Sequence, residues 1–195
     1  MELLEERLAK LWMTGVRKSI PPGGIPRAAW EHPLDLVKVI QSELIRTHPT
    51  TVDYLIRLAW LHDLLEDGSK PDGSRVTDED LWFAGVDSQL VEDVVDISRR
   101  QGEEKNEYLA RLISTPTRVR LVKCIDRACV LREAPKKSAG WWDEYSASTR
   151  KYILPLARSL STKEGLDTWA VGLLEHALTL RPSRRMHQVL VGSPR

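Results

Sequence analysis

The chain has 195 residues, of which 42% are hydrophobic and 29% are charged, and its formal net charge is +1. This length and composition predict one folded domain and exclude a disordered chain. The near-neutral charge gives no general basis for nucleic-acid binding, and no apolar run approaches the roughly 20 residues that a membrane-spanning helix needs.

The first residues, MELLEERLAK, are acidic and amphipathic, which distinguishes them from a secretory signal. The two cysteines, Cys124 and Cys129, lie five residues apart on one predicted helix, so their side chains point in different directions. We therefore expect two reduced thiols in the core rather than a disulfide, and a cytoplasmic location for the protein.

Hydrophobic residues recur with the helical period along nearly the whole chain, and no stretch alternates as a β-strand would. The sequence therefore predicts an all-α fold. We expect a single domain over residues 1–180 and a basic tail, RPSRRMHQVLVGSPR, over residues 181–195. In chain order, the predicted helices span residues 2–12, 33–47, 51–66, 78–84, 88–100, 103–114, 117–132, 141–160 and 163–180.

Local signals mark where several of these helices begin and end. Thr77 precedes the acidic turn of DEDLWF, Asp87 precedes SQLVEDVV, and Thr115 precedes a proline, which predicts capping side chains at all three positions. The segments SIPPGGIPR (19–27) and DGSKPDGSR (67–75) are rich in proline, glycine and serine, and this composition predicts loops.

The segment LAWLHDLLEDG carries four ionisable residues in an otherwise apolar run: His62, Asp63, Glu66 and Asp67. A helix that is apolar on nearly every side is buried, so these side chains must face the interior or a cleft. Three buried carboxylates would repel one another and lose hydration, and a divalent metal would offset their charge at one point. Alternatively, the end of the helix emerges into solvent and leaves Glu66 and Asp67 hydrated.

Two further residues join this group. Asp126 shares a helix face with apolar residues such as Val122, and a buried aspartate needs a strong partner. His32 lies at the start of the helix that begins near Pro33. The basic residues near Asp126 in sequence are expected to lie largely on other faces of the helix: Arg120, Lys123 and Arg127.

Three segments therefore supply two imidazoles and two carboxylates, from His32, His62, Asp63 and Asp126. This set of side chains suits a divalent metal. Mixed nitrogen and oxygen ligands without a thiolate favour Mn²⁺ or Fe²⁺, with Zn²⁺ as an alternative.

The order of these residues resembles the HD-domain metal-dependent phosphohydrolases, in which a histidine, a His-Asp pair and a lone aspartate follow one another along the chain. The extended form HDLLED is similar to the His-Asp-x-x-Glu-Asp box of the hydrolases of guanosine tetra- and pentaphosphate, (p)ppGpp. These are the alarmone synthetase/hydrolases and the small stand-alone alarmone hydrolases. Further segments resemble the family in the same order over about residues 5–160: WEHPLDLVKVI, RVRLVKCIDRACVLRE and GWWDEYSASTRKYILPLARSL.

The resemblance implies a single-domain HD-fold helical bundle with the metal site between central helices. It implies that His32, His62, Asp63 and Asp126 hold Mn²⁺. Glu66 and Asp67 would then orient and deprotonate the attacking water. The substrate-binding residues that the resemblance suggests are Arg17, Lys18, Arg27, Lys123, Arg127, Tyr145 and Tyr152.

The sequence departs from the family at Val130, where the family usually has an asparagine that contacts the substrate, and in the loop GGIPRAAWEH before the first histidine. Our first hypothesis is therefore a phosphohydrolase that removes the 3′-pyrophosphate of (p)ppGpp. The second is an HD-family hydrolase of another phosphorylated nucleotide, namely a nucleoside mono- or triphosphate or an NADPH-like dinucleotide. The third is a catalytically silent HD protein that binds a nucleotide.

The expected partner is a small nucleotide, and neither nucleic acid nor a membrane. The basic tail lacks the interleaved aromatic residues that nucleic-acid binding would favour. Of the adjacent pair Trp141 and Trp142, only one can face the core of a helical domain. The other would cover the cleft or a contact between subunits, which leaves a homo-oligomer open.

Overall fold

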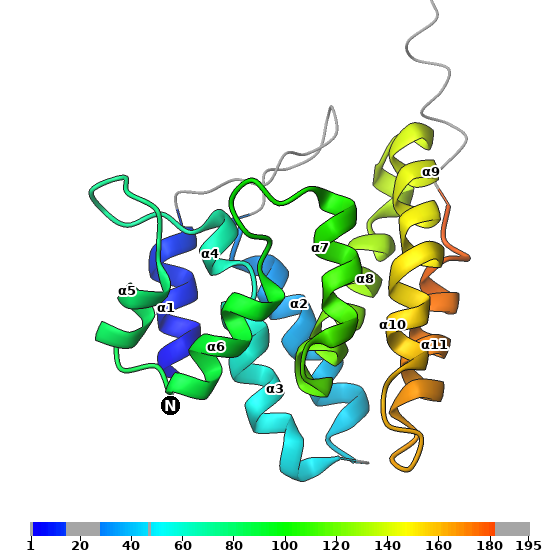
Figure 1. The fold of residues 1–195 in the computed structure, drawn as a ribbon, viewed down its shortest axis with the longest axis horizontal. Coiled ribbons are helices and arrows are strands. Elements are labelled where there is room, and N and C mark those ends of the chain that lie inside the picture. Colours follow the sequence, from blue (N-terminus) through cyan, green and yellow to red (C-terminus); the bar gives the residue numbers. More distant parts are fainter. Residues whose placement is uncertain (1, 15–27, 47, 182–195) are drawn as a thin grey trace, which may run out of the picture.

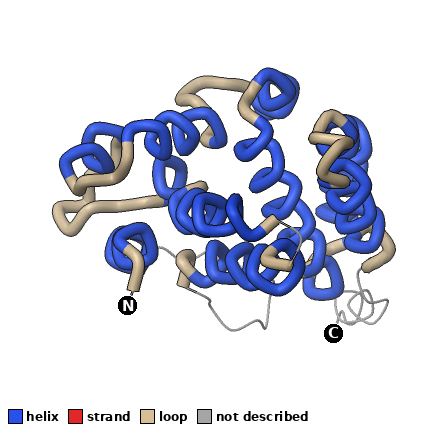
Figure 2. Tube along the Cα trace, turned by 90° about the horizontal axis from the view of Figure 1, so that it is seen from below, coloured by secondary structure: helices blue, strands red, loops and turns tan. Residues whose placement is uncertain are grey.

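The computed structural model describes residues 2–14, 28–46 and 48–181 (Figure 1). No strand occurs among these residues, although Ser69 and Arg75 form an isolated bridge. Figure 2 shows helices joined by loops throughout this part of the chain. The prediction of an all-α fold is therefore confirmed. The tail over residues 182–195 lies outside the described part, and no helix within that part is long and apolar enough to cross a membrane.

The helices follow one another with short turns between them. Two turns are π-helical, η1 (Ile40–Leu44) and η4 (Thr149–Ile153), and two are 3₁₀ turns, η2 (Leu112–Ser114) and η3 (Ala134–Lys136). The α-helices are α1 (Leu4–Met13), α2 (Glu31–Val39), α3 (Pro49–Leu61), α4 (Leu64–Asp67), α5 (Asp78–Phe83), α6 (Ser88–Ile97), α7 (Lys105–Arg111), α8 (Thr117–Arg132), α9 (Ala139–Ser148), α10 (Leu154–Arg158) and α11 (Leu166–Ala177).

Helix α8 is the centre of the bundle. It packs against α2, α3 and α6 on one side and against α10 and α11 on the other (Figure 1). Residues 121–129 are buried without interruption, because neighbouring helices cover α8 on nearly every side. Polar side chains on this helix therefore lie inside the protein and need partners there.

Four predicted helices are interrupted in the structure, over 33–47, 51–66, 103–114 and 141–160, and the second and fourth carry predicted site residues. The helix predicted over 51–66 ends at Leu61, and a two-residue turn at His62 and Asp63 precedes α4. The helix predicted over 141–160 is α9, η4 and α10 in succession. At the breaks within 51–66 and 141–160 the backbone keeps right-handed helical dihedral angles. The apolar residues therefore keep their helical spacing across each break, and the sequence pattern does not reveal it.

The predicted helix starts have different outcomes. Thr77 accepts a hydrogen bond from the backbone N–H of Asp80 in a capping box, and Asp87 accepts from two backbone N–H groups of α6, as predicted. The prediction for Thr115 is wrong. Its hydroxyl donates to the carbonyl of Leu112 in the preceding turn, and Pro116 itself occupies the position before α8.

Cys124 and Cys129 are both buried and form no disulfide, as predicted. Burial disfavours the thiolate and raises the pKa of each thiol to about 12. Both cysteines therefore remain neutral core side chains at physiological pH.

A partly buried ion pair joins three helices of the bundle. Asp93 on α6 is fully buried and accepts a hydrogen bond from the hydroxyl of Tyr54 on α3 at 2.6 Å. The guanidinium of Arg118 on α8 donates to both oxygens of the same carboxylate, with Nη2 at 2.9 Å from Oδ1. The charge of Asp93 is thus compensated, and α3, α6 and α8 are held in register.

We expect Asp93→Ala to lower the free energy of unfolding by about 2 to 3 kcal/mol, because it removes charge-assisted hydrogen bonds from Arg118 and Tyr54. Urea denaturation would measure this loss. The matched control is Asp53→Ala, which removes an exposed carboxylate beside Tyr54 and should change the value by less than about 0.5 kcal/mol. Equal effects of the two substitutions would contradict the role of Asp93.

Candidate metal centre

Three of the predicted metal ligands lie together inside the bundle. His32 comes from the first turn of α2, and His62 and Asp63 come from the turn between α3 and α4. One nitrogen or oxygen atom from each of the three lies within 4.8 Å of the other two. Nε2 of His62 is 3.1 Å from Oδ1 of Asp63, and the two histidine rings are 5.3 Å apart at their centroids.

Asp126 on α8 extends this cluster. Its Oδ1 lies 2.8 Å from Nε2 of His32 and 3.8 Å from Nε2 of His62. Four side chains from separate segments therefore converge, and both His62 and Asp126 are buried. We use the name histidine–aspartate cluster for His32, His62, Asp63 and Asp126.

The turn at His62 and Asp63 places two adjacent residues in one cluster. In an uninterrupted helix, side chains at neighbouring positions diverge by about 100°. At the turn that follows Leu61 the ring nitrogen of His62 and the carboxylate oxygen of Asp63 nevertheless lie 3.1 Å apart.

The orientation of His62 leaves a ring nitrogen without a hydrogen-bond partner. Its Nδ1 lies 2.8 Å from the carbonyl of Ala59, and a carbonyl can only accept, so Nδ1 carries the hydrogen. Nε2 is buried and makes no hydrogen bond of acceptable geometry, despite its short distance to Asp63. In neutral His62 the lone pair of Nε2 would face carboxylate oxygens, so a positive charge between them is required.

The spacing within the cluster also fits a bound cation. Nitrogen and oxygen ligands held about 2.1 Å from one ion lie about 3 to 4 Å from one another, as simple geometry requires. The separations of 3.1 and 3.8 Å between Nε2 of His62 and the carboxylates of Asp63 and Asp126 fall in this range, and the 2.8 Å between His32 and Asp126 is a hydrogen bond. The residues present therefore fit a divalent metal, with two imidazoles and two carboxylates as ligands.

The electrostatics of the cluster favour a cation as well. Burial alone would lower the pKa of His62, but the carboxylates of Asp63 and Asp126 outweigh it and raise that pKa. Burial would raise the pKa of Asp126, but Lys123 and the two histidines outweigh it and hold that pKa well below its usual value. The carboxylates thus favour a positive charge beside them, at the ring of His62 or on a bound cation.

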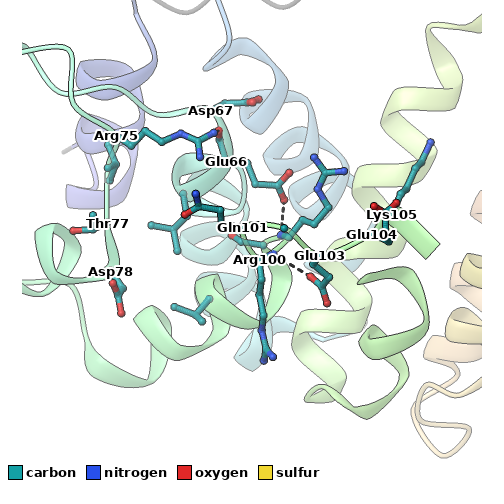
Figure 3. A pocket seen from close by; sticks show the side chains of 16 residues that line it. Glu66, Asp67, Arg75, Thr77, Asp78, Arg100, Gln101, Glu103, Glu104 and Lys105 are labelled. Atoms are coloured by element: carbon teal, nitrogen blue, oxygen red, sulfur yellow. Dashed lines mark hydrogen bonds between the residues drawn. The ribbon is translucent and has the colours of Figure 1, made fainter. Parts of the chain in front are cut away.

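Glu66 and Asp67 on α4 are half-buried and line a cleft of about 950 Å³ (Figure 3). Oε1 of Glu66 accepts a hydrogen bond from the backbone N–H of Arg99 at 2.9 Å. Burial raises the pKa of Glu66, and nearby Lys123 opposes that rise. Of the two alternatives for these carboxylates, placement at the wall of a cleft therefore describes them better than full hydration.

The cleft lies between the loop that follows α4 and the loop that joins α6 to α7. Its lining starts at Leu65, so the histidine–aspartate cluster adjoins it through α4 and does not line it. Figure 3 shows Arg75 on one side of Glu66 and Lys105 on the other. Sequence reasoning missed these basic residues. The one feature of the sequence that could have identified them is that each is a basic residue in, or next to, a predicted loop.

The structure places Lys123 and Arg127 inside the protein. Nζ of Lys123 lies 2.8 Å from Oδ2 of Asp126, so the prediction that Lys123 lies on another face of the helix is wrong. Arg127 is buried, and its Nη1 donates to the hydroxyls of Ser148 and Thr149. The other basic residues that the resemblance suggested, Arg17, Lys18 and Arg27, lie outside the described part of the chain.

The two tyrosines suggested as nucleotide contacts are both half-buried. Tyr145 stacks on Trp141 with ring centroids 4.3 Å apart, and the side chains of Lys105 and Arg127 lie over its ring. Tyr152 has the ammonium of the adjacent lysine 4.8 Å from its ring centroid. A base that stacks on Tyr145 would therefore have to displace one of the groups already in contact with it.

Trp142 is buried, whereas Trp141 is half-buried and packs against Tyr145. The prediction that only one tryptophan of this pair faces the core is confirmed. Lys105, at the start of α7, lies over the ring of Tyr145 and forms an ion pair with Glu144 on α9. This contact ties the start of α7, at the edge of the cleft, to α9.

Comparison with known proteins supports the fold. No protein-family model and no curated protein sequence matches the chain. A solved structure of a metazoan orthologue of SpoT is similar, with a TM-score of 0.66 and 17% sequence identity over 96% of this chain and 94% of that chain. That protein hydrolyses ppGpp and plays a role in starvation responses. The chain therefore has the all-α fold of this hydrolase along almost its whole length.

Proposed function

We propose that the protein is a metal-dependent phosphohydrolase that acts on a nucleotide, and that it removes the 3′-pyrophosphate of (p)ppGpp. The observation that carries the proposal is the buried Nε2 of His62, which faces the carboxylates of Asp63 and Asp126 without a hydrogen-bond partner. The fold shared with the ppGpp-hydrolysing metazoan orthologue of SpoT supports the reaction class.

His32, His62, Asp63 and Asp126 would hold the metal. The donor set of two nitrogens and two oxygens favours Mn²⁺, with Fe²⁺ or Zn²⁺ as alternatives. A divalent cation bound there would act as a Lewis acid on a phosphoryl oxygen and would make water more acidic. The carbonyl of Ala59 would keep Nε2 of His62 directed at the ion by holding the opposite ring nitrogen.

Glu66 would act as the general base. The N–H of Arg99 fixes Oε1, which leaves Oε2 to accept the proton from water. Burial raises the pKa of Glu66 above that of an ordinary glutamate, which makes its carboxylate a better proton acceptor near neutral pH. Asp67, on the same helical turn, would orient the water that attacks phosphorus.

The negative charge of the substrate needs basic partners. Arg75 and Lys105 line the cleft beside Glu66, where phosphoryl oxygens would lie. Further proposed substrate contacts are Arg17, Lys18, Arg27, Tyr145 and Tyr152, and Arg127 would support Tyr145 from within the protein.

A second substrate class is favoured by one residue. Val130 lies on α8 one turn after Asp126 and is half-buried. Its side chain offers neither a hydrogen-bond donor nor an acceptor at a position where the resembling family usually has an asparagine. Loss of such a group changes which substrate a pocket prefers. Nucleoside mono- and triphosphates and NADPH-like dinucleotides therefore belong among the substrates to be tested.

We expect Mn²⁺ to stabilise the protein. At a free concentration 100-fold above its dissociation constant, a bound ligand adds about 2.7 kcal/mol, or about 5 to 10 °C in melting temperature at this chain length. His62→Gln should abolish the shift, because it removes the buried Nε2. The control His176→Gln changes an exposed histidine on α11 and should retain the shift. Differential scanning fluorimetry measures both, and a full Mn²⁺ shift in H62Q would contradict the metal site.

We expect Mn²⁺-dependent release of pyrophosphate from ppGpp in a panel of phosphorylated nucleotides. Asp63→Ala should lose both the release and the Mn²⁺ shift. Glu66→Gln should lower kcat about 10²- to 10⁴-fold and keep the shift, because it removes the base and leaves the ligands in place. The matched control is Glu79→Gln, at an exposed glutamate on α5.

The panel also separates the remaining hypotheses. Release from another nucleotide, with ppGpp unchanged, would assign the protein to a different substrate of the same reaction class. A normal Mn²⁺ shift without release from any nucleotide would contradict hydrolysis and would favour a silent protein that binds a nucleotide.

A further inference from the structure

The carboxylate of Asp126 has a different neighbour at each oxygen. Oδ1 lies 2.8 Å from Nε2 of His32 and 3.8 Å from Nε2 of His62. Oδ2 lies 2.8 Å from the ammonium nitrogen of Lys123. Because Lys123 and Asp126 are three residues apart on α8, they are neighbours on the surface of one helix. The ion pair thus leaves Oδ1 as the oxygen that faces the histidines.

Lys123 is enclosed by the protein. Its side chain is 11% exposed, and its ammonium lies 5.2 Å from the ring centroid of Tyr108. The hydroxyl of Tyr108 donates to the carbonyl of Ile97, so this ring is itself held in place. Lys123 is absent from the lining of the 950 Å³ cleft. It is therefore poorly placed to contact a phosphate group that enters from there.

We propose that Lys123 is a positioning residue: an internal counter-ion that pairs with Oδ2 of Asp126 and leaves Oδ1 directed at the histidines before a metal binds. A buried carboxylate without a partner is costly and tends to neutralise. The ammonium of Lys123 supplies the missing charge from within the same helix. This inference rests on the proposed function insofar as the histidine–aspartate cluster holds a divalent cation.

The proposal predicts how the loss of Lys123 changes the stabilisation that a bound metal provides. Both cations offset the charge of Asp126, so each replaces part of the stabilisation that the other provides. Loss of Lys123 should therefore harm the metal-free protein most, and bound metal should restore part of the loss. A lysine that contacts only substrate would show neither effect. A lysine with a purely structural role would leave the response to metal unchanged.

The test is Lys123→Met, which removes the charge and keeps an unbranched side chain. We expect metal-free K123M to melt about 10 °C below the wild type, because a buried ion pair loses one partner. Mn²⁺ should then raise its melting temperature several degrees more than it raises that of the wild type. The matched control is Lys38→Met, at an exposed lysine 3.7 Å from Asp35, and it should change both values by less than about 2 °C.

Two results would overturn the role of Lys123 alone: metal-free K123M melting within about 2 °C of the wild type, or a Mn²⁺ response in K123M no larger than in the wild type. Absence of any Mn²⁺ response in the wild type would overturn the metal site, and the role of Lys123 with it. If K123M does not fold, the metal-free melting temperature and the Mn²⁺ response are measured for Lys123→Gln instead. The glutamine amide keeps a hydrogen-bond donor but carries no charge.

Discussion

The candidate site depends on one hydrogen bond, from Nδ1 of His62 to the carbonyl of Ala59. It decides which ring nitrogen carries the hydrogen and turns the other toward Asp63 and Asp126. In a buried, weakly screened cluster, a lone pair that faces two carboxylates is unfavourable unless a positive charge lies between them. A divalent cation would meet this requirement, and the proposed hydrolase chemistry depends on it.

The fold supplies the elements that meet this requirement. Helix α8 is covered on nearly every side, so Asp126 is buried and has little access to water. The turn between α3 and α4 brings His62 and Asp63 to the same point, and the first turn of α2 adds His32. The ammonium of Lys123 forms an ion pair with the second carboxylate oxygen of Asp126, Oδ2. Glu66 on α4 lines the cleft, where a substrate has room to bind.

Much of this arrangement could be predicted from local patterns. The helical period and the caps at Thr77 and Asp87 act over short distances in the sequence. The ligand set was predicted from the order of the histidines and aspartates along the chain, which extends from His32 to Asp126. The turn at His62 could not be predicted, because the apolar period passes through it unchanged. Lys123 was misplaced although residues three apart on a helix are only about 60° apart, a spacing that lets Lys123 and Asp126 pair. The cleft lies between two loops that are distant in the sequence, and no local sequence pattern predicts that they lie side by side.

The most direct test of the central claim is a crystal structure of the protein grown with Mn²⁺, with anomalous diffraction to locate the ion. The account predicts one strong anomalous peak at about 2.1 Å from Nε2 of His62, with His32, Asp63 and Asp126 as further ligands. It would be contradicted by a map without a peak at the histidine–aspartate cluster in which Nε2 of His62 is hydrogen-bonded to Asp63. In that case a protonated histidine would supply the positive charge, and the cluster would be an ordinary buried ion pair.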